Sequence, residues 1–458
     1  MSTSVQNRRL NDRSPQGSLL YLGVVVLVAA LGGLLFGFDT AVISGTIGLF
    51  KVEFELSAAM IGWTSSSALV GCMLGAALAG MLSDRFGRKK VLLLSAVLFT
   101  VSAVWCGLAV TVGQLIWARI LGGMGIGIAS MLSPLYIAEV SPPRLRGRLV
   151  SLQQFAIISG ILGAYFSNSL VLHTGLSDPA KWRWMFALGA FPAGIFFLLL
   201  WLVPESPRWL VKQGLVDRAR GILNRVAGVA AADAEMAQIQ SALAHEGASL
   251  RELLKPGLRL ALLIGILLAV FQQITGINAI LYYAPEIFKA AGSEARSAFN
   301  DTVWIGVVNL LFTIVAIALI DRLGRKPLLV MGTIAMGLAL VLVGLAFSLK
   351  VSGVGLLAVI LAYVAAFAAS QGPVVWVIVS EIFPTRIRGR AMSVATVCLW
   401  AACYLVSQTF PILVETVGSA VTFWLYAAMC LVTVVFVVLF VPETKGKSLE
   451  EIEARWAK

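Results

Sequence analysis

Apolar residues dominate this 458-residue chain in long stretches, which short segments rich in charged residues separate. A helix needs about 20 residues to cross the hydrocarbon core of a bilayer, and we find twelve stretches that suit that length. Their centres lie near residues 32, 70, 101, 126, 160, 193, 272, 310, 338, 368, 401 and 430. The pattern therefore predicts an all-α membrane protein with twelve transmembrane helices.

The polar segments between these stretches occur twice at nearly one spacing. Asp84–Lys90 returns at 321–326, Glu139–Arg148 returns at 381–390, and Pro204-Glu205-Ser206 returns as Pro442-Glu443-Thr444. Repeated polar segments at matching places between apolar stretches indicate two homologous halves, each with six spans. Such a repeat of membrane topology is the plan of a transporter.

The repeat divides the chain into five expected parts. They are a tail over 1–18, a six-helix bundle over 19–203, a helical linker over 204–258, a second six-helix bundle over 259–441 and a tail over 442–458. In the linker, Ser206 before Pro207 is typical of a helix start and Gly214 of a helix stop. Further short helices are predicted over 216–226, 231–244 and 448–458. The linker is either a solvated connection or a helical latch beneath one mouth of the bundle.

Composition and charge agree with a bilayer as the surroundings. The chain is 59% hydrophobic and 13% charged, which leaves too little polar surface for a soluble protein of this length. Of its 35 Lys and Arg residues, 28 fall in the two tails and in the segments on their side of the membrane. The positive-inside rule assigns that side to the cytoplasm, so the net charge of +12 implies no nucleic-acid partner.

We therefore expect a multi-pass protein of the cell membrane, whether a bacterial inner membrane or a plasma membrane, with both termini in the cytoplasm. The first 18 residues are polar, and no small-residue cleavage site follows the next apolar run. This segment is interpreted as a cytoplasmic tail and not as a signal peptide.

Charged residues gather at the cytoplasmic ends of the spans. Acids are expected at C-terminal helix ends and arginines near N-terminal ends, where each sign opposes the helix dipole. Such a choice, made four times, suggests a network of ion pairs that closes the inner face in one state and breaks in the other; the alternative is ordinary topology signals. The residues are Asp84, Arg88, Glu139, Arg146, Arg148, Glu205, Asp321, Arg325, Glu381, Arg388, Arg390 and Glu443.

Asp39 and Arg119 are the ionisable residues expected deep within spans. An isolated charge there is expensive and is a functional hypothesis by default. Counting residues from the span ends places both at a similar depth, so the two side chains could pair. Burial favours a neutral carboxyl group and a nearby guanidinium favours the carboxylate, so a change in this contact could load or release a proton. The alternative is a static ion pair that holds two spans together.

Amides and tryptophans supply the other polar groups within the spans. They include Gln153, Gln154, Gln272, Gln273, Asn278, Asn309, Trp376 and Trp400, and Gly276 can loosen the helix between Gln273 and Asn278. Amides donate and accept hydrogen bonds at once, which suits a neutral polyhydroxy ligand, and indole faces suit the C–H side of a sugar ring. The alternative is that the amides join helices to one another.

Several segments together resemble the sugar porter family of the major facilitator superfamily, which includes bacterial proton:xylose and hexose symporters and facilitative glucose transporters. They are GFDTAVISG at 37–45, PESPRWL at 204–210, QQITGIN at 272–278 with YYAP at 282–285, GPVVW at 372–376 and PET at 442–444. The resemblance covers nearly the whole chain. It implies two pseudo-symmetric six-helix bundles that work by alternating access.

The resemblance also implies roles for residues. Sugar hydroxyl contacts are implied for Gln154, Gln272, Gln273, Asn278, Asn309 and Trp376, with Phe36, Ile161, Phe367 and Trp400 lining the site. Asp39 matches the proton-coupling aspartate of bacterial proton:xylose symporters, where mammalian facilitative carriers generally have asparagine. The chain departs from its relatives at Leu399 and Cys403, where they commonly have Gln or Asn, so one wall of the site is less polar.

We expect a proton-coupled symporter for a hexose or pentose monosaccharide, and not an enzyme. The alternatives are a facilitative sugar uniporter, a polyol transporter and a sugar sensor that does not transport. An ATP-driven pump is disfavoured, because Gly446-Lys447-Ser448 has Val441 where a phosphate-binding loop needs glycine. The five cysteines fall in apolar stretches without paired spacing, so no disulfide, metal site or cofactor is expected.

Overall fold

The computed structural model describes residues 17–244, 258–383 and 388–445, and these ranges contain eighteen α-helices. Fifteen of them, alone or in consecutive pairs, make twelve spans that are long and apolar enough to cross a membrane. Each span contains one of the twelve centres expected from the sequence. The prediction of twelve transmembrane helices is confirmed.

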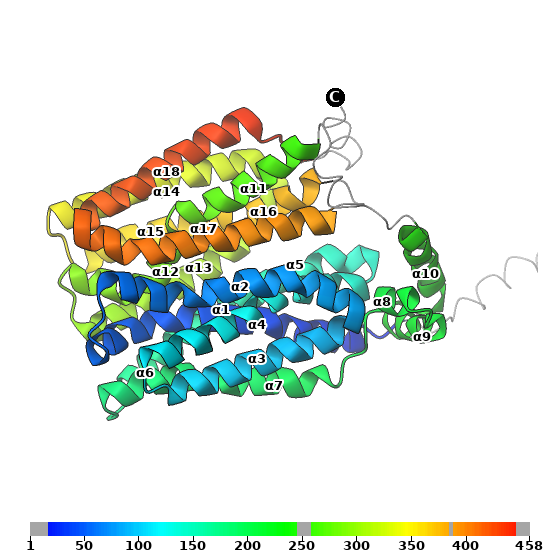
Figure 1. Ribbon diagram of the computed structural model, residues 1–458. Helices are drawn as coiled ribbons and strands as arrows, with labels where there is room; N and C mark the ends of the chain where they lie inside the picture. The colour runs from blue at the N-terminus through cyan, green and yellow to red at the C-terminus, as the bar shows by residue number, and fades with distance from the viewer. Residues whose placement is uncertain (1–16, 245–257, 384–387, 446–458) are drawn as a thin grey trace, which may run out of the picture.

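The helices form two bundles that lie side by side (Figure 1). The first holds α1 (Leu19–Glu53), α2 (Ala58–Phe86), α3 (Arg88–Leu108), α4 (Val112–Val140), α5 (Pro143–Leu172), and α6 (Asp178–Ala187) with α7 (Ala190–Leu200) as one span. The second holds α11 (Leu258–Ile274) with α12 (Ile277–Ala290), α13 (Ala295–Leu323), α14 (Arg325–Ser348), α15 (Val354–Ala369) with α16 (Gln371–Ile382), α17 (Arg388–Val417) and α18 (Ser419–Phe440).

Small residues let helices of one bundle approach closely. α2 packs along α4, where a Cβ on Gly123 would lie 1.8 Å from the carbonyl oxygen of Ala68. α1 packs along α5, where a Cβ on Gly160 would lie 2.0 Å from the carbonyl oxygen of Leu34. Close backbone contact of this kind gives membrane helices the van der Waals packing that lipid does not supply.

Helices α2, α5 and α1 of the first half pack on α17, α13 and α12 of the second half. Two spans of the second half are interrupted. The span of α11 and α12 breaks at Gly276, whose φ of 95° lies in the left-handed region that glycine adopts readily. The span of α15 and α16 breaks at Ser370, three residues before Pro373. Proline lacks a backbone N–H and clashes with the preceding turn, so a continuous helix is disfavoured there.

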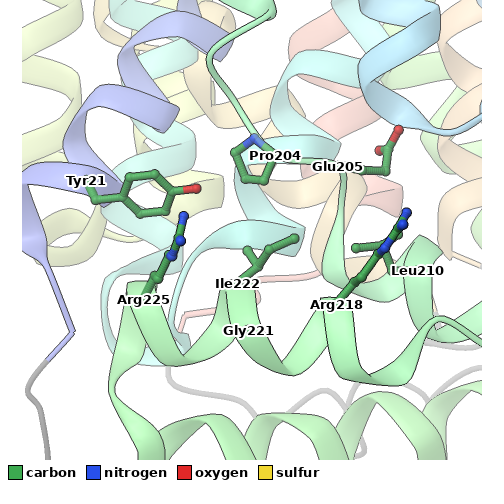
Figure 2. A pocket seen from close by; sticks show the side chains of 8 residues that line it. All are labelled: Tyr21, Pro204, Glu205, Leu210, Arg218, Gly221, Ile222 and Arg225. Atoms are coloured by element: carbon green, nitrogen blue, oxygen red, sulfur yellow. The ribbon is translucent and has the colours of Figure 1, made fainter.

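The linker forms three short helices at one end of the bundles, α8 (Pro207–Lys212), α9 (Val216–Ala227) and α10 (Val229–Ala244). They confirm the helices predicted after Ser206 and over 216–226 and 231–244, whereas the one predicted over 448–458 lies outside the described residues. The Ser206 hydroxyl caps α8 by accepting from the Trp209 backbone N–H at 3.3 Å. A cavity separates α9 from the first turn of α1 (Figure 2). We call this end of the molecule the linker end and the other the far end.

Candidate functional site

Asp39 of α1 and Arg119 of α4 form an ion pair inside the first bundle. Arg119 Nη1 donates to Asp39 Oδ1 at 2.9 Å and to the Asp39 backbone oxygen at 3.1 Å. The guanidinium carbon lies 5.4 Å from the centre of the Phe186 ring, which adds a cation–π contact. The Arg119 side chain is 1% exposed and that of Asp39 is 18% exposed. The contact that the sequence suggested between these residues is present.

The pair leaves two polar atoms unused. Asp39 Oδ2 and Arg119 Nε are buried and have no hydrogen-bond partner among the described residues. A carboxylate oxygen without a partner is the place where a proton can be added without breaking a hydrogen bond. Oδ1 accepts from the arginine, whereas Oδ2 is the oxygen that has no such partner.

Gln272 ties the two interrupted spans of the second bundle together. Its Nε2 donates to the backbone oxygens of Gln371 and Gly372 at 2.7 and 3.2 Å, next to the break at Ser370. Its Oε1 accepts from Gln273 Nε2 at 3.2 Å. Gln272 is buried, with 3% of its surface exposed. Both ends of its amide already have hydrogen-bond partners. In this arrangement Gln272 holds the two interrupted spans together, and its amide has no group left over that is directed to a ligand.

Gln273 and Asn278 face each other across the break at Gly276. Asn278 Nδ2 donates to Gln273 Oε1 and to Cys403 Sγ, the latter at 3.1 Å. Cys403 is one of the two positions where the resemblance leads us to expect an amide. The Cys403 sulfur accepts from the Asn278 side-chain amide. Sulfur is a weak acceptor, whereas a Gln or Asn side chain at this position would offer a stronger one.

Aromatic rings of the two halves meet between α1 and α17. The Phe36 and Trp400 rings lie 5.4 Å apart in an edge-to-face arrangement, and Trp400 Nε1 is buried without a hydrogen-bond partner among the described residues. Phe367 packs against Gly372, where an added Cβ would lie 3.4 Å from the ring. An indole N–H with no protein acceptor is suited to a ligand hydroxyl group.

The other candidates are less closely connected. Ile161 lies on α5, where α5 meets Gly37 of α1, while Gln154 is on α5, Asn309 on α13 and Trp376 on α16. Within the described ranges, no hydrogen bond or ring contact joins these four side chains to the other candidate residues. Their assignment to a sugar site stays a prediction.

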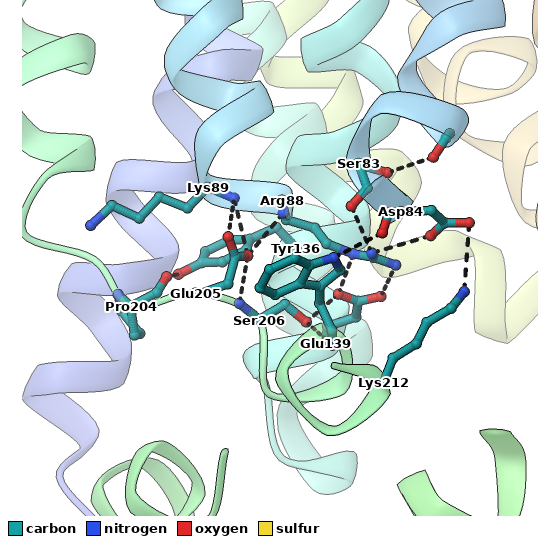
Figure 3. Close-up of polar contacts among 12 residues, drawn as sticks. Ser83, Asp84, Arg88, Lys89, Tyr136, Glu139, Pro204, Glu205, Ser206 and Lys212 are labelled. Atoms are coloured by element: carbon teal, nitrogen blue, oxygen red, sulfur yellow. Dashed lines mark hydrogen bonds and ion pairs between the residues drawn. The ribbon is translucent and has the colours of Figure 1, made fainter. Parts of the chain in front are cut away.

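At the linker end, charged residues of the first half form the network shown in Figure 3. The Arg88 guanidinium donates two hydrogen bonds to the Glu139 carboxylate, at 2.9 and 3.0 Å, and one to Asp84 Oδ1 at 3.3 Å. The Ser206 hydroxyl donates to the same Glu139 carboxylate, and Lys212 of α8 lies 3.7 Å from Asp84. The linker is thus attached to the ends of α2, α3 and α4.

Glu205 caps the N-terminus of α3 and does not pair with an arginine side chain in this network. Its carboxylate accepts from the backbone N–H groups of Arg88, Lys89 and Ser206 at 2.8–3.2 Å. A Cβ on Gly87 would lie 2.3 Å from this carboxylate, so only glycine allows the approach. Burial raises the pKa of Glu205, and the backbone hydrogen bonds offset part of that rise.

The second half repeats the arrangement. Arg325 Nη2 lies 3.2 Å from Glu381, and the Thr444 hydroxyl donates to the Glu381 carboxylate. Thr444 thus corresponds to Ser206, which donates to Glu139 in the first half. Glu443 caps α14 by accepting from the N–H groups of Arg325 and Lys326 at 3.2 and 3.0 Å. Burial acts to raise the pKa of Glu443, but these hydrogen bonds outweigh it, and the pKa is lowered.

The remaining expected members of the network are placed differently. Arg146 pairs with Glu235 of α10 at 2.6 Å, whereas the side chains of Arg148 and Arg390 are exposed without an ion pair among the described residues. The side chains of Asp321 and Arg388 lie outside the described part. Sequence reasoning missed Ser206, Thr444 and Glu235. The repetition of a hydroxyl residue after each Pro-Glu was the available signal for the first two.

Polar side-chain contacts between the two halves lie toward the far end. Lys51 of α1 pairs with Glu286 of α12. The Ser66 hydroxyl donates to Gln408 Oε1 at 3.1 Å, and the Ser169 hydroxyl donates to Asn300 Oδ1, also at 3.1 Å. By contrast, the ion pairs described above at the linker end stay within one half or join the first half to the linker. The two halves are therefore fastened together at the far end.

No group of three or more His, Cys, Asp and Glu residues is placed to hold a metal ion within the described ranges. The five cysteines are free, and four of them are buried.

Comparison with known proteins places this arrangement in a family. The family model for sugar (and other) transporters matches residues 25–456. The arabinose-proton symporter of Bacillus subtilis is 47% identical and the D-xylose-proton symporter of Escherichia coli is 43% identical, each over 95% of this chain and 96% of the relative. The fold matches the xylose transporter XylE from E. coli in a partially occluded inward-open conformation, with a TM-score of 0.85, 41% identity, and coverage of 94% of this chain and all of that one. The chain belongs to the sugar porter family of the major facilitator superfamily.

Proposed function

We propose that this protein is a proton-coupled monosaccharide symporter that works by alternating access. The observation that carries the proposal is the buried Asp39–Arg119 pair, in which one carboxylate oxygen holds the arginine and the other is without a partner. A group of this kind can gain or lose a proton inside the membrane and change its contact with a neighbour when it does.

The substrate class follows from the amides and from the relatives. Asn278, Gln273 and the indole of Trp400 offer donors and acceptors next to an aromatic face, which suits a neutral sugar. Relatives that are 47% and 43% identical are named for arabinose and xylose. We infer that an aldopentose is the preferred substrate and that hexoses are weaker ones.

We infer that the linker end faces the cytoplasm, because 28 of the 35 Lys and Arg residues belong to segments on that side. The halves are fastened at the far end through Lys51 and Glu286, and the fold resembles an inward-open structure. The described conformation would accordingly have its sugar site closed to the outside. Both termini would be cytoplasmic.

The transport cycle follows from these assignments. A proton on Asp39 Oδ2 would neutralise the carboxylate that pairs with Arg119. The guanidinium would then be able to form contacts with other groups. This change would occur while sugar is bound, so that the loaded carrier reorients from outside to inside. Loss of the proton on the cytoplasmic side restores the ion pair seen here, after which the empty carrier returns.

Uptake into proteoliposomes tests the proposal. Labelled arabinose, xylose, glucose, galactose and inositol are each supplied with and without an inward proton gradient. We expect uphill accumulation of a pentose that collapses when a protonophore is added. Equilibration that ignores the proton gradient would make the protein a facilitator, and flux of inositol alone would make it a polyol carrier; either result would overturn the proposal.

A further inference from the structure

We propose that the linker end holds a binding site for a phosphate-bearing anion, in a cavity between α9 and the first turn of α1. The cavity measures about 420 Å³ and is lined by Tyr21 of α1, by Pro204 and Leu210, and by Arg218, Ile222 and Arg225 of α9 (Figure 2). It is separate from the Asp39–Arg119 pair and from the sugar candidates, which lie within the bundles.

Two guanidinium groups supply the charge. Arg218 and Arg225 are seven positions apart, which places them on one face of α9, and both line the cavity. Figure 2 shows Arg225 extending toward Tyr21 and Arg218 extending toward the side of Glu205. Neither side chain has a hydrogen bond or an ion pair within the described ranges. Other basic groups of the linker are engaged, since Arg220 lies 3.5 Å from Asp233 and Lys212 lies 3.7 Å from Asp84.

The acid of the cavity does not neutralise these arginines. Glu205 lines the same space, but its carboxylate oxygens accept from the backbone N–H groups at the start of α3. The Arg218 and Arg225 guanidinium groups therefore line a cavity in which the Glu205 carboxylate accepts from other donors. Arginine forks bind phosphate oxygens through paired hydrogen bonds, so an anion with phosphate geometry fits this arrangement best.

The surroundings of the cavity favour the headgroup of a phospholipid over a soluble phosphate ester. Leu19 and Leu20 directly precede the lining residue Tyr21 and are 71% and 80% exposed. Trp201 and Leu202 lie just before the lining residue Pro204 and are 61% and 69% exposed. Exposed apolar residues at the ends of two spans mark the boundary of the bilayer. A lipid phosphate at that depth would be within reach of α9, with acyl chains along these side chains.

An anion at this site would fasten the linker to the first bundle. The backbone N–H of Ser18 already donates to the carbonyl oxygen of Arg225 at 2.8 Å, so α9 and α1 are joined at one edge of the cavity. A bound phosphate would join them at a second place. The assignment to the inner leaflet depends on the proposed topology, but binding itself does not depend on transport.

Native mass spectrometry of the full chain in neutral detergent tests the site. The probes are phosphatidylglycerol, phosphatidylcholine and glycerol 3-phosphate, each added alone. The variants are Arg218→Gln with Arg225→Gln, the charge-retaining Arg218→Lys with Arg225→Lys, and Arg220→Gln as the matched control on the same helix. Melting temperature in detergent checks that each variant is folded.

We expect phosphatidylglycerol to bind more tightly than phosphatidylcholine, and the double Gln variant to lose roughly ten- to thirty-fold in affinity, since each basic group near an anionic surface contributes about a factor of five. Arg220→Gln should bind nearly as the natural chain does, and the double Lys variant should lose less affinity than the double Gln variant, because it keeps the charge but not the paired hydrogen bonds. Equal binding of phosphatidylglycerol by the double Gln variant would overturn the site. Tight binding of glycerol 3-phosphate without the lipid would overturn the lipid as the source. Because binding is measured without sugar flux, a failure here is distinct from a failure of symport.

Discussion

The two carboxylate oxygens of Asp39 have different surroundings, and this difference leads to a prediction about coupling. Asparagine keeps the oxygen that accepts from Arg119 but cannot take up a proton. We expect Asp39→Asn to exchange labelled sugar with preloaded sugar at a rate within a few-fold of the natural chain, yet to lose accumulation against a gradient. Counterflow and gradient-driven uptake in the same proteoliposomes measure the two activities.

Asp178→Asn is the matched control for this variant. Asp178 forms an exposed ion pair with Lys181 at the far end, three positions along the chain, and exposed pairs contribute little. Its accumulation ratio should equal that of the natural chain. Uphill accumulation that survives in Asp39→Asn would assign proton coupling to another residue.

Gln272 and Gln154 were both expected to contact sugar, but the structure distinguishes them. The Gln272 amide satisfies two backbone oxygens beside the break of α15 and α16, and leaving such buried groups unpaired costs roughly 1–3 kcal/mol. We expect Gln272→Leu to lower the melting temperature as well as transport. Gln154→Leu should raise the KM for sugar with little change in melting temperature. Thermal unfolding and concentration-dependent uptake separate the two effects, and equal melting losses would contradict this assignment.

Some features of the site could be predicted from single residues and others could not. Depth along two spans was enough to suggest the Asp39–Arg119 contact, because charges inside a bilayer are rare and costly. The partners of Gln272 could not be predicted, because they are backbone oxygens exposed by a helix break almost 100 positions away. Asn278 and Cys403 are likewise 125 positions apart in the chain.

At the scale of helices, the caps on α3 and α14 are alike in geometry but differ in electrostatics. The pKa of Glu205 is raised from its ordinary value of 4.5 by burial, whereas that of Glu443 is lowered by the backbone N–H groups it accepts from. Glutamine should therefore be tolerated at 205 and unfavourable at 443 at neutral pH. We expect Glu443→Gln to cost a few tenths of a kcal/mol to about 1 kcal/mol in unfolding free energy, and Glu205→Gln to cost less.

The pH dependence should have opposite signs at the two caps. Stability contributed by Glu443 is present above pH 4.5 and is lost as the pH falls through its lowered pKa. The contribution of Glu205 is fully present below pH 4.5 and declines as the pH rises through its raised pKa. Melting temperatures of both Gln variants from about pH 3 to about pH 7, relative to the natural chain, measure the difference. Equal slopes for the two variants would contradict it.

The helices themselves could largely be predicted, because the length of an apolar run and its polar flanks are local properties. Glycine at 276 also indicated the break between α11 and α12, since its φ of 95° suits that residue. The break at Ser370 was missed, although Gly372 and Pro373 were a signal for it. The break between α6 and α7 has Pro192 shortly after it. Both helices pack on α1 and α3, and no local sequence pattern contains those contacts.

At the scale of the whole molecule, the ion pairs are arranged unequally between the two ends. At the linker end, Arg88 with Glu139 and Arg325 with Glu381 each join helices of one half. At the far end, Lys51 and Glu286 join one half to the other. Pairs within a half can persist while the halves rock, but a pair between halves must break when the far end opens. The Lys51–Glu286 contact therefore biases the conformational equilibrium toward the state described here.

Removing this contact should move the molecule toward the opposite state. The Lys51 and Glu286 side chains are 37% and 17% exposed, so we take the pair to be worth about 1 kcal/mol, which corresponds to a shift of about five-fold in population. Spin labels on Val110 and Val354, which are exposed at the far ends of different halves, report the separation of the halves. In Lys51→Met, we expect the longer-distance population to grow.

Lys289→Met distinguishes this effect from a general loss of charge. Lys289 also pairs with Glu286, at 2.8 Å, but both residues belong to α12, so their contact does not resist separation of the halves. Its removal leaves Glu286 to Lys51 alone, and the longer-distance population should stay the same or shrink. Growth of that population to the same extent in both variants would mean that net charge at the far end sets the equilibrium. Growth in Lys51→Met alone would mean that a single ion pair between the halves helps to decide which side of the membrane the sugar site faces.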